Sequence, residues 1–292
     1  MKITNIVVRK FNSDPNLFVG ILLTALLVLS FPVHSDDNPD DDWEEDPTGN
    51  RFGIAFGGFF PKLDTLVRVD AADGNLGTII DFESTLGMDK SNNLPIVRGF
   101  YRFNEKHRIN FGYFNLERSG LGVSDVEIRF GDVTFPANLP LNSFFDIEVM
   151  DLTYGYTLIH NEKWDLEASV GLSLQKIGIG IQGAALGVLR EEVEVTVPLP
   201  TFGFSGMYAL TDKLLLGGRL GVFTIELDLD SSNIGGSVID AQLTLLHQTF
   251  KNVGFGIGAN YFKVNVDYED DDLHVDAKYD YIGPTIFLIG YF

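Results

Sequence analysis

The chain has 292 residues, with 41 acidic against 21 basic side chains and a formal net charge of −20. This acid excess repels nucleic-acid phosphates, so we expect no nucleic-acid partner. The lack of cysteine excludes disulfides, thiolate nucleophiles and cysteine-ligated metals, and a hydrophobic content of 45% is too high for a disordered acidic chain.

The first 35 residues have the pattern of a secretory signal peptide. Lys2, Arg9 and Lys10 precede an uncharged, mostly apolar run at 17–31, which Pro32 ends. This run is short for a membrane-spanning helix, and small residues before position 36 suit cleavage after Ser35. We therefore expect residues 1–35 to be removed on export; an uncleaved membrane anchor is the alternative.

Residues 36–49 follow as an acidic stretch that is too charged to pack against a core. We expect a disordered, solvated tail on the periplasmic side of the membrane. Calcium binding is an alternative, but the spacing of the acids matches no EF-hand loop.

Residues 50–292 show many long stretches that alternate between apolar and polar or small residues. Val253, Phe255 and Ile257 alternate with glycines, for example. Such stretches are longer than the strands of ordinary globular sheets, which favours membrane-spanning strands over a soluble sandwich. Several stretches exchange their apolar face partway, as at Tyr261–Phe262, and Gly283–Pro284 looks like a similar point. We expect β-bulges at these positions.

The spacing of turn residues also alternates. Tight turns are expected at 104–107, 160–164, 211–213 and 251–253, and longer loops near 119–124, 183–187, 230–236 and 269–273. Short turns at one end and long loops at the other are typical of outer-membrane β-barrels, whose short turns face the periplasm.

The last strand, ending in Ile289-Gly290-Tyr291-Phe292, resembles the C-terminal strand of bacterial outer-membrane barrel proteins. The stretches at 77–88 and 99–114 are similar to sequences of small porin-like barrels of the OmpA and OmpW type. This resemblance covers about 51–292 and implies that the barrel-assembly machinery reads the terminal Phe292. It also implies a Gram-negative outer-membrane location, with lipid and lipopolysaccharide around the barrel.

The fold expected is therefore all-β, a single antiparallel transmembrane β-barrel of about ten strands over residues 50–292. Ten strands result if Asn50–Phe60 is a strand and Asp64–Ser84 is an extracellular excursion. If Asp64–Asp70 and Leu76–Ser84 cross the membrane themselves, the count is twelve. Both are even numbers, as bacterial barrels of this kind have.

The alternation suggests which charged side chains point into the barrel. Candidates for lining a lumen or narrow pore are Arg98, Arg102, Arg108, Glu167, Glu192, Glu194, Arg219, Glu226, Asp240, Lys263, Asp276, Lys278 and Asp280. Opposite charges there can line a passage for small solutes, or form ion pairs that seal it. We expect one of these two roles, structural or porin-like.

Two other classes of function stay open at this stage. The polar excursion at 123–138 could bind a partner or a host surface. His274, among Asp270, Asp271, Asp272 and Asp276, could form a His–Asp dyad at the barrel mouth, which resembles outer-membrane aspartyl-type proteases, or could bind a metal. A solvated acidic loop is the simpler interpretation, so we expect a monomer that is not an enzyme, with no metal and no cofactor.

Overall fold

The computed structural model describes residues 50–71, 74–183, 189–229, 232–270 and 274–292. The expected signal peptide, its cleavage site and the acidic tail lie outside these residues. In the part of the chain that the structure describes, no helix is long and apolar enough to cross a membrane.

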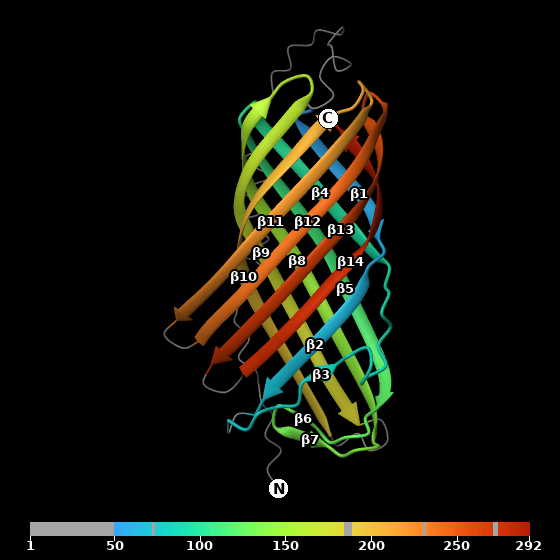
Figure 1. Ribbon diagram of the computed structural model, residues 1–292, viewed down its shortest axis with the longest axis vertical. Coiled ribbons are helices and arrows are strands. Elements are labelled where there is room, and N and C mark those ends of the chain that lie inside the picture. The colour runs from blue at the N-terminus through green and yellow to red at the C-terminus, as the bar shows by residue number, and fades with distance from the viewer. Residues whose placement is uncertain (1–49, 72–73, 184–188, 230–231, 271–273) are drawn as a thin grey trace. The chain divides into compact units, whose positions relative to one another are not determined.

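In the described residues, ten antiparallel strands form a closed ring (Figure 1), which confirms the expected count. The ring closes because β1 pairs with β14 as well as with β4. In ring order the strands are β1 (Phe52–Phe59), β4 (Leu94–Asn104), β5 (His107–Val123), β8 (Pro140–His160), β9 (Trp164–Gly183), β10 (Arg190–Ala209), β11 (Leu214–Leu229), β12 (Ser232–Phe250), β13 (Val253–Asp270) and β14 (His274–Tyr291).

Four further short strands are described that are not counted in the ring of ten. β2 (Lys62–Asp70) continues the line of β1 along β14, so residues 62–70 belong to the barrel wall. This corrects the expectation that the excursion begins at Asp64. β3 (Ile80–Asp81) pairs with β2. β6 (Ile128–Phe130) and β7 (Val133–Phe135) form a separate hairpin between β5 and β8.

The two ends of the barrel differ. Tight connections join β4–β5, β8–β9, β10–β11 and β12–β13 at the end where the C-terminus lies, which we name the turn end (Figure 1). The opposite end, the loop end, carries the β6–β7 hairpin. Strands run further into the loop end than the sequence suggested, because residues 119–123, 232–236 and 269–270 belong to β5, β12 and β13.

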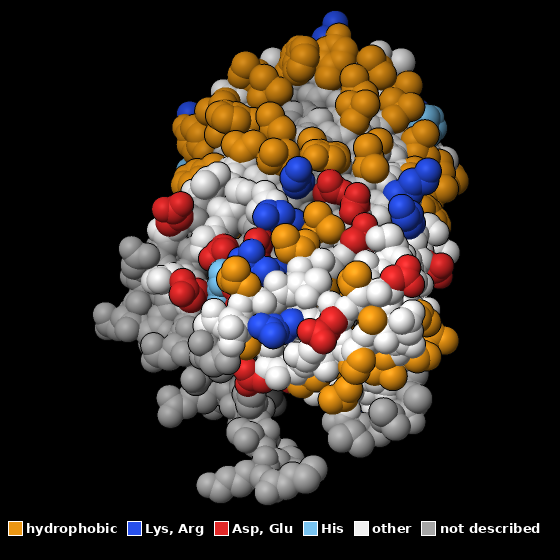
Figure 2. Space-filling view, turned by 60° about the horizontal axis from the view of Figure 1, so that its bottom comes forward, with side chains coloured by type: hydrophobic (Ala, Val, Ile, Leu, Met, Phe, Trp, Pro, Cys, Tyr) orange, Lys and Arg blue, Asp and Glu red, His pale blue; other side chains and the backbone are white. Residues whose placement is uncertain are grey.

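The outer surface of the ring is apolar in its turn-end half. Each ring strand contributes at least one exposed large apolar side chain to this outer belt, and Figure 2 shows the contrast with the polar loop end. Representative members are Phe56, Phe103, Phe111, Leu152, Val170, Phe204, Leu220, Leu243, Ile257 and Leu288.

The polarity of the barrel wall inverts along each long strand: the apolar residues face outward in the turn-end half and inward in the loop-end half. In β13, Ile257 points outward and Asn260 points inward, but nearer the loop end Lys263 is exposed outside and Val264 is buried inside. A strand that leaves hydrocarbon for water needs this exchange, because its outer face must then become polar.

This inversion corrects the expectation of β-bulges at the face switches. β13 and β14 pair without interruption from Val253↔Gly290 to Glu269↔His274, and this run includes Gly283 and Pro284. The register is also continuous between β9 and β10 and between β11 and β12. The register shifts that do occur lie beside the tight turns, at Arg102/Asn104, Thr157/Ile159 and Gln248/Phe250.

The wall splits between β10 and β11 in the loop-end half. The two strands pair only from Phe202↔Val222 to Ala209↔Leu215, although both continue beyond Phe202 and Val222 toward the loop end. Pro198 and Pro200 stand immediately before the split, and proline has no N–H to donate to a neighbouring strand. Their two-residue spacing places both missing donors on the same edge, the one that faces β11.

Beyond the split the barrel is a pair of facing sheets around a dry core. In Figure 1, β11–β14 with β2 run to one side and β5, β8, β9 and β10 cross behind them. The core between them, named the loop-end core, consists of buried apolar residues from both sheets. Its members include Leu63, Val67, Leu116, Phe145, Ile147, Ile177, Ile179, Val195, Val197, Phe262, Val264, Val275 and Tyr279.

Residues 77–93 fill the opening between β2 and β5, where β4 is too short to reach. Glu83 anchors this bridging segment through a buried ion pair with Arg118 of β5 at 2.5 Å, and it also accepts a hydrogen bond from the Thr65 N–H. Phe82 packs edge-on against Phe145, with ring centroids 5.5 Å apart. Gly87 has φ +68, a conformation that favours glycine.

Candidate luminal site

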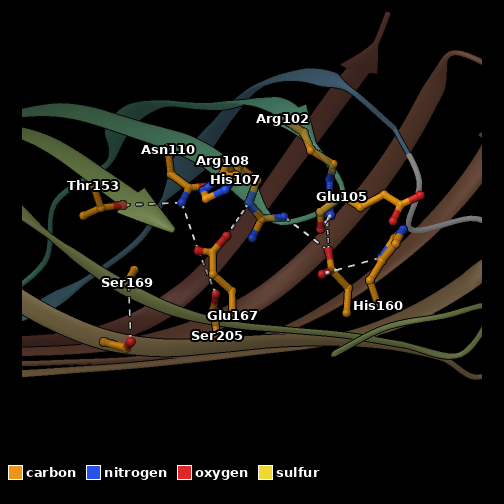
Figure 3. A network of polar contacts seen from close by, with 12 residues as sticks. Arg102, Glu105, His107, Arg108, Asn110, Thr153, His160, Glu167, Ser169 and Ser205 are labelled. Atoms are coloured by element: carbon orange, nitrogen blue, oxygen red, sulfur yellow. Dashed lines mark hydrogen bonds and ion pairs between the residues drawn. The ribbon is translucent and has the colours of Figure 1, made fainter. Parts of the chain in front are cut away.

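A buried network of charges lies inside the barrel near the turn end (Figure 3). Asp165 of β9 pairs with Arg102 of β4 and with Arg108 of β5, whose Nη1 lies 3.4 Å from Asp165 Oδ2. Arg108 Nε lies 2.7 Å from Glu167 Oε2, and Asn110 donates to Glu167 Oε1 at 3.1 Å. Both carboxylates are almost fully buried, at 3% and 2% exposure. The network thus links side chains of β4, β5 and β9 inside the barrel.

A cavity of about 250 Å³ lies next to this network. Asn50 and Tyr291 line it, which places it at the turn end of the barrel. Its lining contains the polar side chains of Arg108, Asn110 and Glu167, and also a set of apolar ones. The apolar lining residues include Ile96, Phe100, Met207, Leu246, Phe287, Ile289 and Tyr291.

Arg98 and Arg219 also line this cavity. Arg219 pairs with Asp240 of β12, with Nε and Oδ2 3.3 Å apart. Asp151 and Asp240 line a second, water-sized space of about 20 Å³, which opens where β10 and β11 separate. Among the residues that the structure describes, no carboxylate forms an ion pair with Arg98.

Six of the thirteen charged residues expected inside do lie on the inner face. They are Arg98, Arg102, Arg108, Glu167, Arg219 and Asp240, which line the cavities or join the buried network. Whether any of them lines a passage for solutes stays a prediction.

The other seven point to the outside, which corrects the sequence-based placement. Glu192, Glu194, Glu226, Lys263, Asp276, Lys278 and Asp280 belong to the loop-end half, where the polarity of the wall has inverted. Lys176 and Glu194 pair on the outer surface at 3.2 Å, and Lys278 pairs with Asp276 at 3.3 Å. Their inward placement followed from assuming that apolar residues face outward along the whole strand.

Sequence reasoning missed several inner polar residues. Asp165 lies two residues before Glu167 on β9, and Asp151, Asn110 and Gln175 follow the same inner alternation on their strands. The period-two pattern alone could have identified Asp165 from Glu167. The contact of Tyr279 with Gln175 needed the fold, since it joins opposite sides of the barrel.

His274 lies at the loop end between two carboxylates. Its Nδ1 is 2.6 Å from Asp70 Oδ2 and its Nε2 is 3.3 Å from Asp267 Oδ2. Burial lowers the pKa of His274, but the hydrogen bonds and charges of Asp267 and Asp70 outweigh burial and raise it above 6.5. Both ring nitrogens are engaged, so neither is available as a base toward a substrate in this arrangement.

The 123–138 excursion contains the β6–β7 hairpin, which is anchored on the loop-end core. Ile128, Phe130 and Phe135 are buried in the loop-end core, so the β6–β7 hairpin caps that core. The hairpin approaches β10, where burial first and then the charges of Asp132 and Glu192 raise the pKa of Glu191 to about 7. Glu191 is therefore a loop-end group whose charge depends on pH near neutrality.

Phe292 follows the last strand at the turn end. Its backbone N–H donates to the Phe52 carbonyl at 3.0 Å, and the Phe52 N–H donates back at 3.2 Å. The Phe292 side chain is largely exposed. Its reading by the assembly machinery stays a prediction.

Comparison with known proteins supports the fold. No family model and no curated protein matches the sequence. The outer membrane protease OmpT from Escherichia coli is similar in structure, with a TM-score of 0.57, 11% identity, and coverage of 84% of this chain and 98% of that chain.

Two further solved structures match with lower TM-scores. OprG, an outer membrane protein from Pseudomonas aeruginosa, gives a TM-score of 0.39 at 10% identity, with 84% of this chain and 99% of that one covered. Ail, the attachment invasion locus protein of Yersinia pestis, gives 0.32 at 10% identity, with 81% and 98% covered. The closed ring, its inverted wall polarity and the match at 0.57 show together that this chain has the fold of a bacterial outer-membrane β-barrel protein.

Proposed function

We propose that the chain spans the outer membrane of a Gram-negative bacterium as a closed barrel that does not conduct solutes. The belt of exposed apolar side chains around the turn-end half supports the membrane location, because it would be unfavourable in water. By the rule for such barrels the turn end faces the periplasm and the loop end faces outward. Lipid and lipopolysaccharide would then surround a monomeric barrel.

The loop-end core is the observation that carries this proposal. Phe145, Ile147, Ile177 and Val264 are at most 1% exposed, so among the described residues the two sheets pack directly against each other at this level. Tyr279 crosses the interior to hydrogen-bond with Gln175 and completes this dry layer. Of the two roles left open by the sequence, structural and porin-like, the packing favours the structural one.

The loop-end structure would then be a rigid scaffold held above the membrane. The bridging segment and the β6–β7 hairpin are packed into the core, so they stiffen this scaffold. Its outer surface carries exposed charges of both signs (Figure 2), which suits contact with water, ions or partner molecules. We assign no catalytic role to His274, because both of its ring nitrogens are held by carboxylates.

Liposome swelling tests this proposal. Liposomes that contain the refolded chain should swell in small sugars no faster than empty liposomes, while a known porin swells them in the same assay. The folded state of the chain is checked beforehand by its shift on unheated against heated gels. Swelling that rises with the amount of folded protein would contradict the proposal.

A further inference from the structure

The turn-end cavity has two chemically different walls. Leu246 and Tyr291 are buried in an apolar cluster, against which Phe100, Phe287 and Ile289 pack. Members of this cluster line the cavity together with the polar groups of the charge network. A lumen that met only water would gain nothing from an apolar wall, since exposing apolar surface to water is unfavourable.

Two arginines besides Arg108 belong to the lining of this cavity, and one of them, Arg219, also lines the smaller space. Arg98 and Arg219 lie within electrostatic range of each other, and both line the cavity. The carboxylates near them, Asp151 and Asp240, line the separate water-sized space instead. Asp165 and Glu167 also line the cavity, but both are paired with Arg102 or Arg108. Arg98 is therefore the lining cation that no carboxylate of the described residues pairs with.

We infer that this cavity is a binding site for a small organic acid with an apolar body. The acid group contacts Arg98 and Arg219, because guanidinium groups bind carboxylates by paired, charge-assisted hydrogen bonds. The apolar body lies along Leu246, Phe287 and Ile289. Mostly apolar lining with a few convergent polar groups is the usual composition of small-molecule sites.

The site is independent of whether the barrel conducts. The cavity lies on the turn-end side of the loop-end core, so a ligand that reaches it from that end need not pass the core. A conducting barrel could still bind the acid, and a silent barrel could fail to bind it. The two ideas therefore succeed or fail separately.

Equilibrium dialysis of labelled octanoate against the refolded chain in lipid nanodiscs tests the inference. Binding above the level of empty nanodiscs should saturate, and octanol should compete about 10-fold less well because it lacks the charge. Arg98→Gln should weaken octanoate binding about 10-fold for the same reason. Arg129→Gln, in the hairpin at the opposite end of the barrel, is the matched control and should bind as the wild type does.

A second variant guards against misfolding of Arg98→Gln. Thr244→Phe fills the cavity from β12 without removing a charge, and it should abolish saturable binding while the chain stays folded on gels. The inference is overturned if the wild type shows no saturable binding. It is also overturned if octanol competes equally, or if folded Thr244→Phe binds octanoate normally.

Discussion

At the scale of single residues, His274 makes a pH-dependent contribution to stability. Its pKa is raised in the folded state, so the protonated ring bound by Asp70 and Asp267 stabilises the fold fully below its ordinary pKa of 6.5. The stabilisation is lost as pH rises through the folded-state pKa. His274→Asn should therefore lower the free energy of unfolding at about pH 5.5, on the order of 1 kcal/mol, and much less at about pH 8.5.

Urea titration in lipid vesicles at both pH values measures this difference. Asp276→Asn, on the same strand and paired with Lys278 at the surface, is the control and should show little change at either pH. An equal loss of stability at both pH values for His274→Asn would contradict a charged ring.

Substitution of Arg118 should lower the free energy of unfolding strongly. Its ion pair with Glu83 is buried, with both side chains 2% exposed, and its guanidinium also lies 5.3 Å from the centre of the Phe145 ring. Arg118→Met leaves the Glu83 carboxylate buried without its cation, which should cost about 3–5 kcal/mol.

Adding Glu83→Gln to Arg118→Met should recover part of that loss, because the uncompensated charge is removed. Urea unfolding of the single and double variants gives the values. A double variant less stable than Arg118→Met would show that Glu83 contributes mainly through its hydrogen bond to Thr65.

At the scale of elements, two prolines account for the split of the wall. If Pro198 and Pro200 prevent β10–β11 pairing by lacking N–H donors, replacing both with valine should extend the ladder toward the loop end. Amide exchange at Thr224 and Glu226 of β11 should then slow about 10-fold. Hydrogen–deuterium exchange measures this, and the amides paired between β12 and β13 serve as the internal control.

Unchanged exchange at Thr224 and Glu226 would contradict this explanation. The side chains of the loop-end core, such as Leu199 against Gly236, would then be what holds the strands apart.

The sequence alone predicted the strands and turns well, but predicted less well which side chains point into the barrel. The turns at 104–107 and 251–253 and the ring of ten strands follow from residue alternation, because pairing in a barrel is between sequence neighbours. The inner placement of Arg102 and Glu167 follows from the same alternation. Lys263 and Asp280 were placed on the wrong face. The apolar–polar alternation keeps its period of two where the wall polarity inverts, so the pattern does not tell which face of the strand meets water.

Long-range features could not be predicted in the same way. Nothing near Glu83 in the sequence indicates Arg118, and the cavity at Arg98 depends on side chains from strands far apart in the chain. These contacts arise from closure of the ring, which alternation along a single strand does not encode.

At the scale of the whole molecule, the central claim is that the dry loop-end core closes the barrel. Single-channel recording of the refolded chain in planar bilayers tests it most directly, with insertion verified in the same preparation by protease protection. The account predicts no discrete conductance steps at high protein concentration. Reproducible steps whose size or ion selectivity changes in Arg98→Ala or Arg102→Ala would contradict it, because ions would then be crossing the lumen beside those side chains.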